Sequence, residues 1–213
     1  MKNIAYTKEY LDHLENIYRH VFTPDCYFGE GLKELKNGVS VFVKDYKGGS
    51  ENTVYRNDKE IFSFKTVNGN NHYEVFTHQN GHEYLFFRKD LYGYSILDLT
   101  TTRDYNYFPA ASFPTGETFI WCEIFYNPIN NIAAVWGCYW ACPYGVILAD
   151  FSDPLSDSPQ VEYYDHIEKD FYYGCGFEFI AWDGTDLILR KGYAETEQEQ
   201  KVISSDEYSA WFK

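Results

Sequence analysis

A chain of 213 residues with 20% aromatic side chains can bury a core, which excludes a disordered protein and fits one substantial domain or two small ones. The formal net charge of −14 argues against nucleic acid and against an anionic membrane surface as partners. The chain has no apolar run of about 18 residues, no apolar signal segment and no disulfide-like spacing of its five cysteines, so we expect a cytoplasmic protein with reduced thiols and no membrane span.

Residues 7–21 are predicted to form an amphipathic helix. Thr7 can cap this helix through its hydroxyl group. The apolar side chains that recur at helical spacing are Tyr10, Leu14, Ile17 and Val21. The charged residues off that stripe, which we expect to face water, are Asp12, Glu15 and Arg19. A helix that precedes a β-array commonly covers a sheet edge or one end of the sheets.

Residues 23–38 hold Pro24 and three glycines and are predicted to be an irregular loop, with at most one helical turn near residues 32–36. We therefore assign an N-terminal helix and loop to residues 1–38 and β-meanders to residues 39–213. No linker in the chain is long or polar enough to divide it, so a single domain over residues 1–213 is predicted.

Strand-like segments with short turns follow from residue 39. VSVFVKDY and NTVYRNDKEIFSF lie within residues 39–64, and residues 73–77 and 83–88 flank the hairpin signal Asn80-Gly81. Four further strands, at residues 119–126, 132–137, 146–149 and 161–164, would form a β-meander.

Two more elements are expected towards the C-terminus. Residues 177–191 form a predicted hairpin about Asp183-Gly184. Ser204 followed by Glu207 is a capping-box pattern, which predicts a short terminal helix over residues 205–212.

Two strand segments match each other at an offset of 52 residues. YGYSILDL, residues 92–99, aligns with YGVILADF, residues 144–151, and Asp98 falls on Asp150. A period of roughly 50 residues built from four-stranded meanders is typical of propeller blades. The predicted fold is therefore all-β, with about four antiparallel, propeller-like repeated meanders after the N-terminal helix. A β-sandwich is the alternative.

Three motifs carry a family resemblance: RKDLYGYS at residues 88–95, ETFIW at residues 117–121 and GCYWACP at residues 137–143. On these motifs, roughly the middle half of the chain resembles a group of conserved bacterial proteins that has no assigned activity. The resemblance implies a shared fold and carries no functional residues with it.

Neither metal-binding nor catalytic cysteine chemistry is favoured by the spacing of the thiols. Cys122, Cys138, Cys142 and Cys175 could together hold zinc, but zinc sites ordinarily use two close pairs, and the chain offers one C-x-x-x-C. We predict no metal and no cofactor. A catalytic cysteine needs a base, and His78 or His166 could reach one only through the fold.

Carboxylates offer a hydrolase interpretation. Glu117, Glu123, Asp150 and Asp153 could supply the pair of acids that glycoside hydrolysis requires. Asp150 ends its strand as Asp98 ends the matching strand, which favours a role as a turn residue. No acid stands out as a general base, so catalytic residues are left unassigned and a non-enzymatic protein is favoured.

Five of the candidate binding residues lie at two matching turns of the repeats, and Trp121 and Glu123 lie in the strand predicted at residues 119–126. If the repeats share an open end, these turns lie on one aromatic rim, because large rigid rings provide contact area at low entropic cost. The residues assigned to it are Arg88, Asp90, Tyr92, Trp121, Glu123, Tyr139 and Trp140. Of these, Tyr139 and Trp140 precede Pro143 and should reach the surface most readily.

The function predicted from these observations is binding of a protein or peptide through the aromatic rim. The net charge of −14 is compatible with a basic partner, because opposite charge accelerates association. The alternatives are a glycosidase-like hydrolase that uses carboxylates in a cleft, and an inhibitor or immunity protein of a basic toxin. Neither nucleic acid nor membrane is expected as a partner.

Overall fold

A computed structural model describes residues 2–68, 71–158, 160–162, 176–191 and 200–212. The chain divides into two compact units, residues 1–118 and 119–213, and each is described by itself. The expectation of a single domain stays a prediction. Within the described ranges, no helix is long and apolar enough to cross a membrane.

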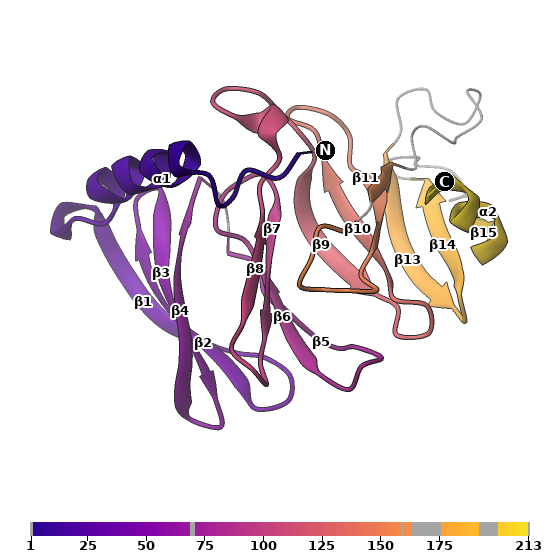
Figure 1. Cartoon of the computed structure of the whole chain (residues 1–213), viewed down its shortest axis with the longest axis horizontal. Coiled ribbons are helices and arrows are strands. Elements are labelled where there is room, and N and C mark those ends of the chain that lie inside the picture. Colours follow the sequence, from indigo (N-terminus) through magenta and orange to yellow (C-terminus); the bar gives the residue numbers. More distant parts are fainter. Residues whose placement is uncertain (1, 69–70, 159, 163–175, 192–199, 213) are drawn as a thin grey trace. The chain divides into compact units, whose positions relative to one another are not determined.

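The first unit contains two antiparallel sheets whose strands follow chain order, as Figure 1 shows. The strands of the first sheet are β1 Tyr27–Glu34, β2 Val39–Tyr46, β3 Gly49–Arg56 and β4 Lys59–Val67. The strands of the second sheet are β5 Glu74–Thr77, β6 Glu83–Phe87, β7 Tyr94–Asp98 and β8 Asp104–Tyr107. Each sheet is therefore a meander in which neighbours in sequence are neighbours in space.

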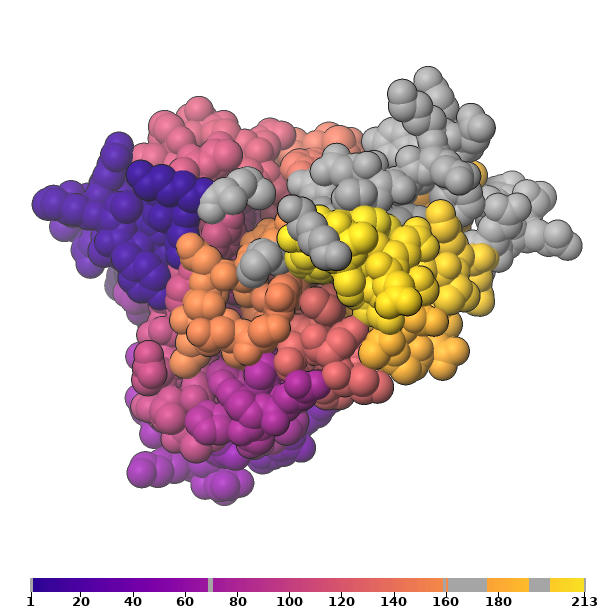
Figure 2. Space-filling view, turned by 45° about the vertical axis from the view of Figure 1, so that its right-hand side comes forward, coloured from indigo at the N-terminus to yellow at the C-terminus, as the bar shows by residue number. Residues whose placement is uncertain are grey.

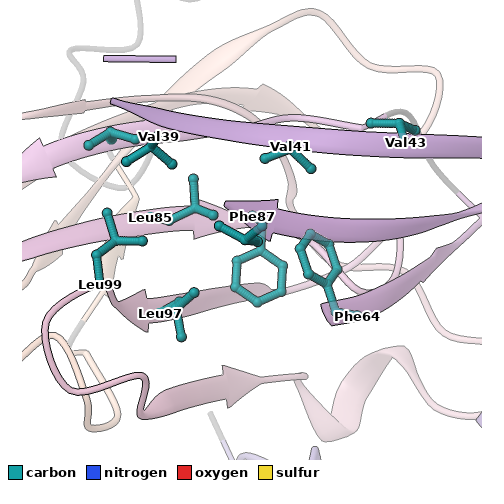
Figure 3. Packing of buried hydrophobic residues seen from close by; sticks show 10 residues of the cluster. Val39, Val41, Val43, Phe64, Leu85, Phe87, Leu97 and Leu99 are labelled. Atoms are coloured by element: carbon teal, nitrogen blue, oxygen red, sulfur yellow. The ribbon is translucent and has the colours of Figure 1, made fainter. Parts of the chain in front are cut away.

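The two sheets of the first unit pack together through alternate side chains. In Figure 3, Val39, Val41 and Val43 of β2 lie opposite Leu85 and Phe87 of β6. All five side chains are at most 2% exposed. Strand geometry explains the pattern, because residues two apart point to the same face of a sheet. At about 25 cal/mol per Å² of apolar surface removed from water, this cluster is a principal stabilising element of the unit.

Helix α1, Lys8–Val21, lies across the ends of these sheets. The Thr7 hydroxyl accepts a hydrogen bond from the backbone N–H of Tyr10, which confirms the predicted cap. Tyr10 and Leu14 are buried against Val67 at the end of β4 and Phe108 after β8. The short 3₁₀ turns are η1 Pro24–Cys26 and η2 Ala110–Ser112.

Strand β1 corrects the sequence interpretation. Residues 23–38 were expected to be a loop, yet Tyr27–Glu34 is a strand that pairs with β2. Seven of its eight residues are exposed and none is buried. The sequence of this strand therefore lacks the alternation of apolar and polar residues that a half-buried strand shows. A strand with two open faces is held mainly by its backbone hydrogen bonds, which no side-chain pattern reports.

The second unit also consists of antiparallel sheets. One has the strands β9 Ile120–Tyr126, β10 Ile132–Cys138, β11 Gly145–Asp150 and β12 Gln160–Glu162, paired in chain order. The other has β13 Phe177–Asp183, β14 Asp186–Lys191 and β15 Gln200–Ile203, followed by α2 Ser205–Ser209 and η5 Ala210–Phe212. The C-terminal residues, in yellow, are at the surface in Figure 2.

The core of the second unit joins its two sheets and its terminal helix. Val146 and Leu148 of β11 pack with Leu187 and Leu189 of β14 and with Tyr208 of α2. The Ser204 hydroxyl accepts a hydrogen bond from the backbone N–H of Glu207, which confirms the predicted cap of α2.

These sheets and the N-terminal helix confirm the all-β class predicted from the sequence. The two segments that align at an offset of 52 residues supply β7 and β11, each the third strand of a four-stranded meander. A closed propeller and a repeat relationship between the meanders stay predictions.

Candidate functional site

A pocket of about 410 Å³ lies in the first unit between α1 and the strands β7 and β8. Helix α1, drawn in indigo, lies at the surface of the molecule in Figure 2. Its pocket-lining side chains follow helical spacing and are Tyr10, Leu11, Leu14, Glu15 and Tyr18. The other lining residues are Ala5, Tyr6, Lys89, Asp90, Tyr92, Tyr94, Ser95, Asn106, Tyr107 and Phe108.

Local backbone geometry brings the loop after β6 beneath the helix. Gly93 has a φ of +82°, and a Cβ there would lie 2.1 Å from the carbonyl oxygen of Tyr107, so this turn requires glycine. Asn68 adopts a φ of 57°, in the left-handed region that asparagine tolerates. On the helix side, Tyr10 stacks on Phe108 with ring centroids 4.3 Å apart. The pocket is therefore built on a packed helix and a constrained turn.

Asp90 is a buried carboxyl group in this pocket and is 8% exposed. Its Oδ1 accepts hydrogen bonds from the backbone N–H of Leu91 at 2.7 Å and from the Asn68 amide at 3.2 Å. Its Oδ2 accepts one long bond, 3.3 Å, from the Tyr10 hydroxyl. Among the described residues, no lysine or arginine forms an ion pair with Asp90. Its Oδ2 thus retains acceptor capacity.

Burial dominates the titration of the groups around Asp90. Burial raises the pKa of the Asp90 carboxyl above its ordinary value, although its hydrogen bonds and the charge on His13 act in the opposite direction. Burial, and then the nearby Asp90 charge, raise the pKa of Tyr10, and the same causes raise that of Tyr18 to about 12. Burial and the Glu117 charge raise the pKa of Tyr92. The hydroxyl groups of these tyrosines are therefore neutral donors and acceptors at neutral pH.

The charged side chains that line the pocket carry a net acidic balance. Lys89 extends its ammonium group to Asp104, with Nζ 3.1 Å from Oδ2. Glu15 is exposed at the pocket, as the sequence predicted, and lies 3.8 Å from Arg19 along the helix. The basic group of the lining is therefore already paired, whereas no lysine or arginine of the described part of the chain pairs with Asp90.

A second buried aspartate of the same unit has a contrasting environment. Asp98, at the end of β7, is 2% exposed and accepts hydrogen bonds on both oxygens. The backbone N–H groups of Thr100 and Thr101 bind Oδ1, and the Thr101 hydroxyl and His82 Nδ1 bind Oδ2, each at 2.8–3.1 Å. Burial acts to raise the pKa of Asp98, but these hydrogen bonds outweigh it and hold the pKa below its ordinary value.

Three of the residues assigned to the rim belong to the first unit. Asp90 and Tyr92 both line the pocket. Arg88 is buried, 6% exposed, and its carbonyl oxygen accepts a hydrogen bond from the Thr66 hydroxyl. It is absent from the pocket lining, so the pocket brings together two of these three residues.

The other four assigned residues belong to the second unit. Trp121 is buried and packs edge-on against Phe151. Its role in binding stays a prediction. Glu123 is exposed, and Tyr139 is half-buried against the Phe119 ring. Trp140 is 61% exposed in a turn closed by a hydrogen bond from the Cys142 N–H to the Tyr139 carbonyl oxygen. A rim that joins the two turns stays a prediction.

The thiols of the second unit gather near β9 and β10. Burial, and then the neighbouring Cys122 thiol, raise the pKa of Cys138. Cys142 is exposed. Within the part of the chain that the structure describes, no cluster of three histidine, cysteine or acidic side chains could hold a metal ion. Cys175 and His166 lie outside the described residues.

Two of the acids considered for hydrolysis have turn roles. Asp150 Oδ1 accepts hydrogen bonds from the backbone N–H and the hydroxyl of Ser152, as the turn interpretation predicted. Asp153 Oδ1 accepts one from the N–H of Leu155. Glu117 is exposed in the first unit and Glu123 in the second.

The helix side of the pocket is not among the residues predicted from the sequence to bind a partner. Tyr10 belongs to the predicted apolar stripe, and Tyr6 and Tyr18 are not among the predicted binding residues. The available signal was the spacing of Tyr10, Leu14 and Tyr18, which lie four residues apart and so share one face of the helix; Tyr6 precedes the helix. What no spacing shows is that this face meets Asp90, 80 residues later in the chain.

Comparison with known proteins does not assign the chain to a family. No family model and no solved structure matches the chain at a significant level. The uncharacterized protein R762 of Acanthamoeba polyphaga mimivirus is 30% identical over 98 residues, which cover 44% of this chain and 38% of that protein. The match thus spans less than two thirds of the relative's length. Since this relative is viral, the resemblance to bacterial proteins stays a prediction.

Proposed function

We propose that the protein is a non-enzymatic binding module that takes a protein or peptide partner at the pocket beneath α1. The observation that carries this proposal is the pocket itself, a cavity of about 410 Å³ lined mainly by aromatic and aliphatic side chains with few polar groups. Pockets of this size and composition are typical of binding sites, because apolar walls supply affinity and a few polar groups supply orientation.

The entrance of the pocket favours a large partner over an isolated small molecule. Tyr6 and Leu11 line the pocket and are 57% and 46% exposed, so a chain seated there would cover apolar surface that now faces water. The net charge of −14 favours a basic partner and disfavours nucleic acid. Inhibition of a basic toxin in the cytoplasm is one role that fits these properties.

The test is a selection of random displayed peptides on the intact protein, followed by affinity measurements on the enriched peptides. Leu11→Arg places a charged side chain at the pocket and should weaken binding by about tenfold or more. Leu32→Arg makes the same change at an exposed leucine of β1 outside the pocket and should leave the affinity unchanged. Equal affinity for wild type and Leu11→Arg would contradict the proposal.

A hydrolase is the second candidate, and Asp90 is the observation that favours it. A carboxyl group whose pKa is raised by burial in a pocket is the usual form of a general acid. Glycoside hydrolysis also requires a second carboxylate at a defined separation. Turnover of a glycoside or ester that Asp90→Asn abolishes would favour this candidate over the binding module.

We further propose that the sheets are propeller-like repeated blades. The support is that β7 and β11, the segments aligned at an offset of 52 residues, hold the same position in their meanders. A crystal structure in which the four sheets surround one axis is the expected result. Face-to-face packing of the sheets in two layers would instead favour the β-sandwich.

A further inference from the structure

The pocket beneath α1 holds a buried acid that pairs with no lysine or arginine of the described residues, although the charge on His13 acts to lower its pKa. Asp90 is more than nine-tenths buried, and its contacts are three neutral donors: the Leu91 N–H, the Asn68 amide and the Tyr10 hydroxyl. Of these bonds, the one to Oδ2 is the longest, at 3.3 Å. Taking an ionised carboxylate out of water without a counter-charge is costly, so a cation that reaches Oδ2 would be held strongly.

The walls of the pocket suit an organic cation. Rings of Tyr6, Tyr10, Tyr18 and Tyr92 line it, and the negative face of an aromatic ring attracts an ammonium or guanidinium group within about 6 Å. The chain already uses one of these rings in this way. Lys65 Nζ lies 5.4 Å from the centroid of the Tyr18 ring, outside the set of pocket-lining residues.

The remaining charges also favour a positive ligand. Lys89, the basic residue of the lining, is held by Asp104, so it does not neutralise Asp90. Glu15 adds an exposed negative charge on the helix side, although Arg19 lies 3.8 Å from it. An anionic ligand would therefore meet two acids and one engaged lysine, whereas a cation would meet Asp90 and aromatic faces.

We propose that the pocket recognises an alkylammonium group, the side chain of a lysine on the basic partner, with Asp90 Oδ2 as its acceptor and the tyrosine rings around its methylene chain. This inference rests on the proposed binding function and names the group that is bound. The methylene chain of a lysine can pack on apolar walls while its charged end reaches an acid.

Ligand binding is then coupled to a proton. The groups that face Asp90 from the surrounding elements are Tyr10, His13 and Tyr18 of α1, Asn68 after β4, and Tyr92 with the more distant Glu117. A bound ammonium favours the ionised carboxyl, so affinity should rise as pH rises through the pKa of Asp90 and then level off. Calorimetry in buffers of different ionisation enthalpy should report proton release.

The experiment titrates intact protein with three probes by NMR: a lysine-containing peptide, the same peptide with that lysine Nε-acetylated, and butylamine. The lysine peptide should bind about tenfold or more tightly than its acetylated form, which keeps the shape and removes the charge. It should also bind tighter than butylamine. Equal binding of both peptides would overturn the inference, and equal binding of butylamine would overturn a protein as the source of the ammonium.

Matched variants test whether the negative charge of Asp90 binds the ammonium group. Asp90→Asn keeps the shape and should lower affinity for the lysine peptide about tenfold, while Asp12→Asn makes the same change on the exposed side of α1 and should leave it unchanged. Leu11→Glu should strengthen binding where Leu11→Arg weakens it. Full affinity in Asp90→Asn, with the fold verified by its amide spectrum, would overturn the inference.

The two proposals fail in different ways. If the displayed-peptide selection yields peptides that need the pocket but show no lysine preference, the ammonium inference is overturned and the binding function stands. If the selection yields no peptide while butylamine binds wild type and not Asp90→Asn, the ammonium site stands and the peptide-binding function is overturned.

Discussion

Two buried aspartates of the first unit, Asp90 and Asp98, have opposite titration behaviour at nearly equal exposure. Asp98 is 2% exposed and has four hydrogen-bond contacts, two on each oxygen, whereas Asp90 is 8% exposed and has three contacts, one of them long. The pKa of Asp98 is lowered and that of Asp90 is raised. Burial pushes both values upward; at Asp98 the hydrogen bonds to the charged form together outweigh it, and at Asp90 they do not.

The contrast separates a structural acid from a candidate functional one. Asp98 closes the turn after β7 by binding the backbone of Thr100 and Thr101, which is a stabilising role. Asp90 lies in a pocket at a net cost to stability when it is ionised, and such a cost is commonly retained where a side chain serves binding.

Asp98→Asn should destabilise the fold by about 2 kcal/mol, because it removes charge-assisted hydrogen bonds to a buried group. The measurement is urea unfolding at neutral pH, followed by circular dichroism. Asp25→Asn, at an exposed position of η1, is the matched control and should change stability little. A free energy of unfolding equal to that of wild type in Asp98→Asn would show that Asp98 does not have the stabilising role assigned to it.

Asp90→Asn should stabilise the fold by about 1 kcal/mol at neutral pH, because it replaces a buried, uncompensated charge with a neutral group that can keep the bonds to Leu91 and Asn68. The same unfolding assay measures the change, and Asp12→Asn serves as the control. A loss of stability similar to that of Asp98→Asn would mean that both aspartates are structural.

The pH dependence of the unfolding free energy should show directly that the pKa shifts of Asp98 and Asp90 have opposite signs. A lowered pKa in the fold means that Asp98 stabilises above its unfolded pKa, and this contribution disappears as pH falls through the folded value. A raised pKa means that the contribution of Asp90 is full below its unfolded pKa and is lost as pH rises through the folded value.

Unfolding free energies measured from about pH 3 to pH 7 should therefore diverge from wild type in opposite directions for the two Asp→Asn variants as pH rises. Divergence in the same direction would contradict the assigned signs.

Asn68→Gly should give the smallest effect, a further rise in the pKa of Asp90 and a weaker affinity for the lysine peptide. The substitution removes one donor to Oδ1, and glycine accepts the φ of 57° at this position without strain. Titration of the Asp90 carboxyl by NMR measures the shift. A lowered pKa would show that Asn68 does not stabilise the ionised form.

The local part of this molecule was predictable from sequence, and the pocket was not. Helix α1, the hairpin at Asn80-Gly81 and the role of Asp150 follow from caps and turns within a few residues. Strand β1 was missed because both of its faces are open. The pocket depends on contacts between residues near 10 and near 90, and only the fold creates them.

Two of the pocket-lining residues were nevertheless among the predicted binding residues. Asp90 precedes the turn that matches the one near Pro143, and Tyr92 belongs to the aromatic residues near these turns. Tyr10 and Tyr18 escaped because their spacing is equally typical of a helix that buries an apolar face. The hydroxyl groups of tyrosines on such a stripe indicate a binding pocket only when the residues on its opposite wall are known.

The most direct test of the account is an NMR titration of the side-chain carboxyl carbons of Asp90 and Asp98 in the same sample, with and without butylamine. The account predicts a pKa for Asp90 above the ordinary aspartate value and one for Asp98 below it, and a fall in the Asp90 value alone when the amine is present. An Asp90 pKa at or below the ordinary value, unmoved by the amine, would contradict it.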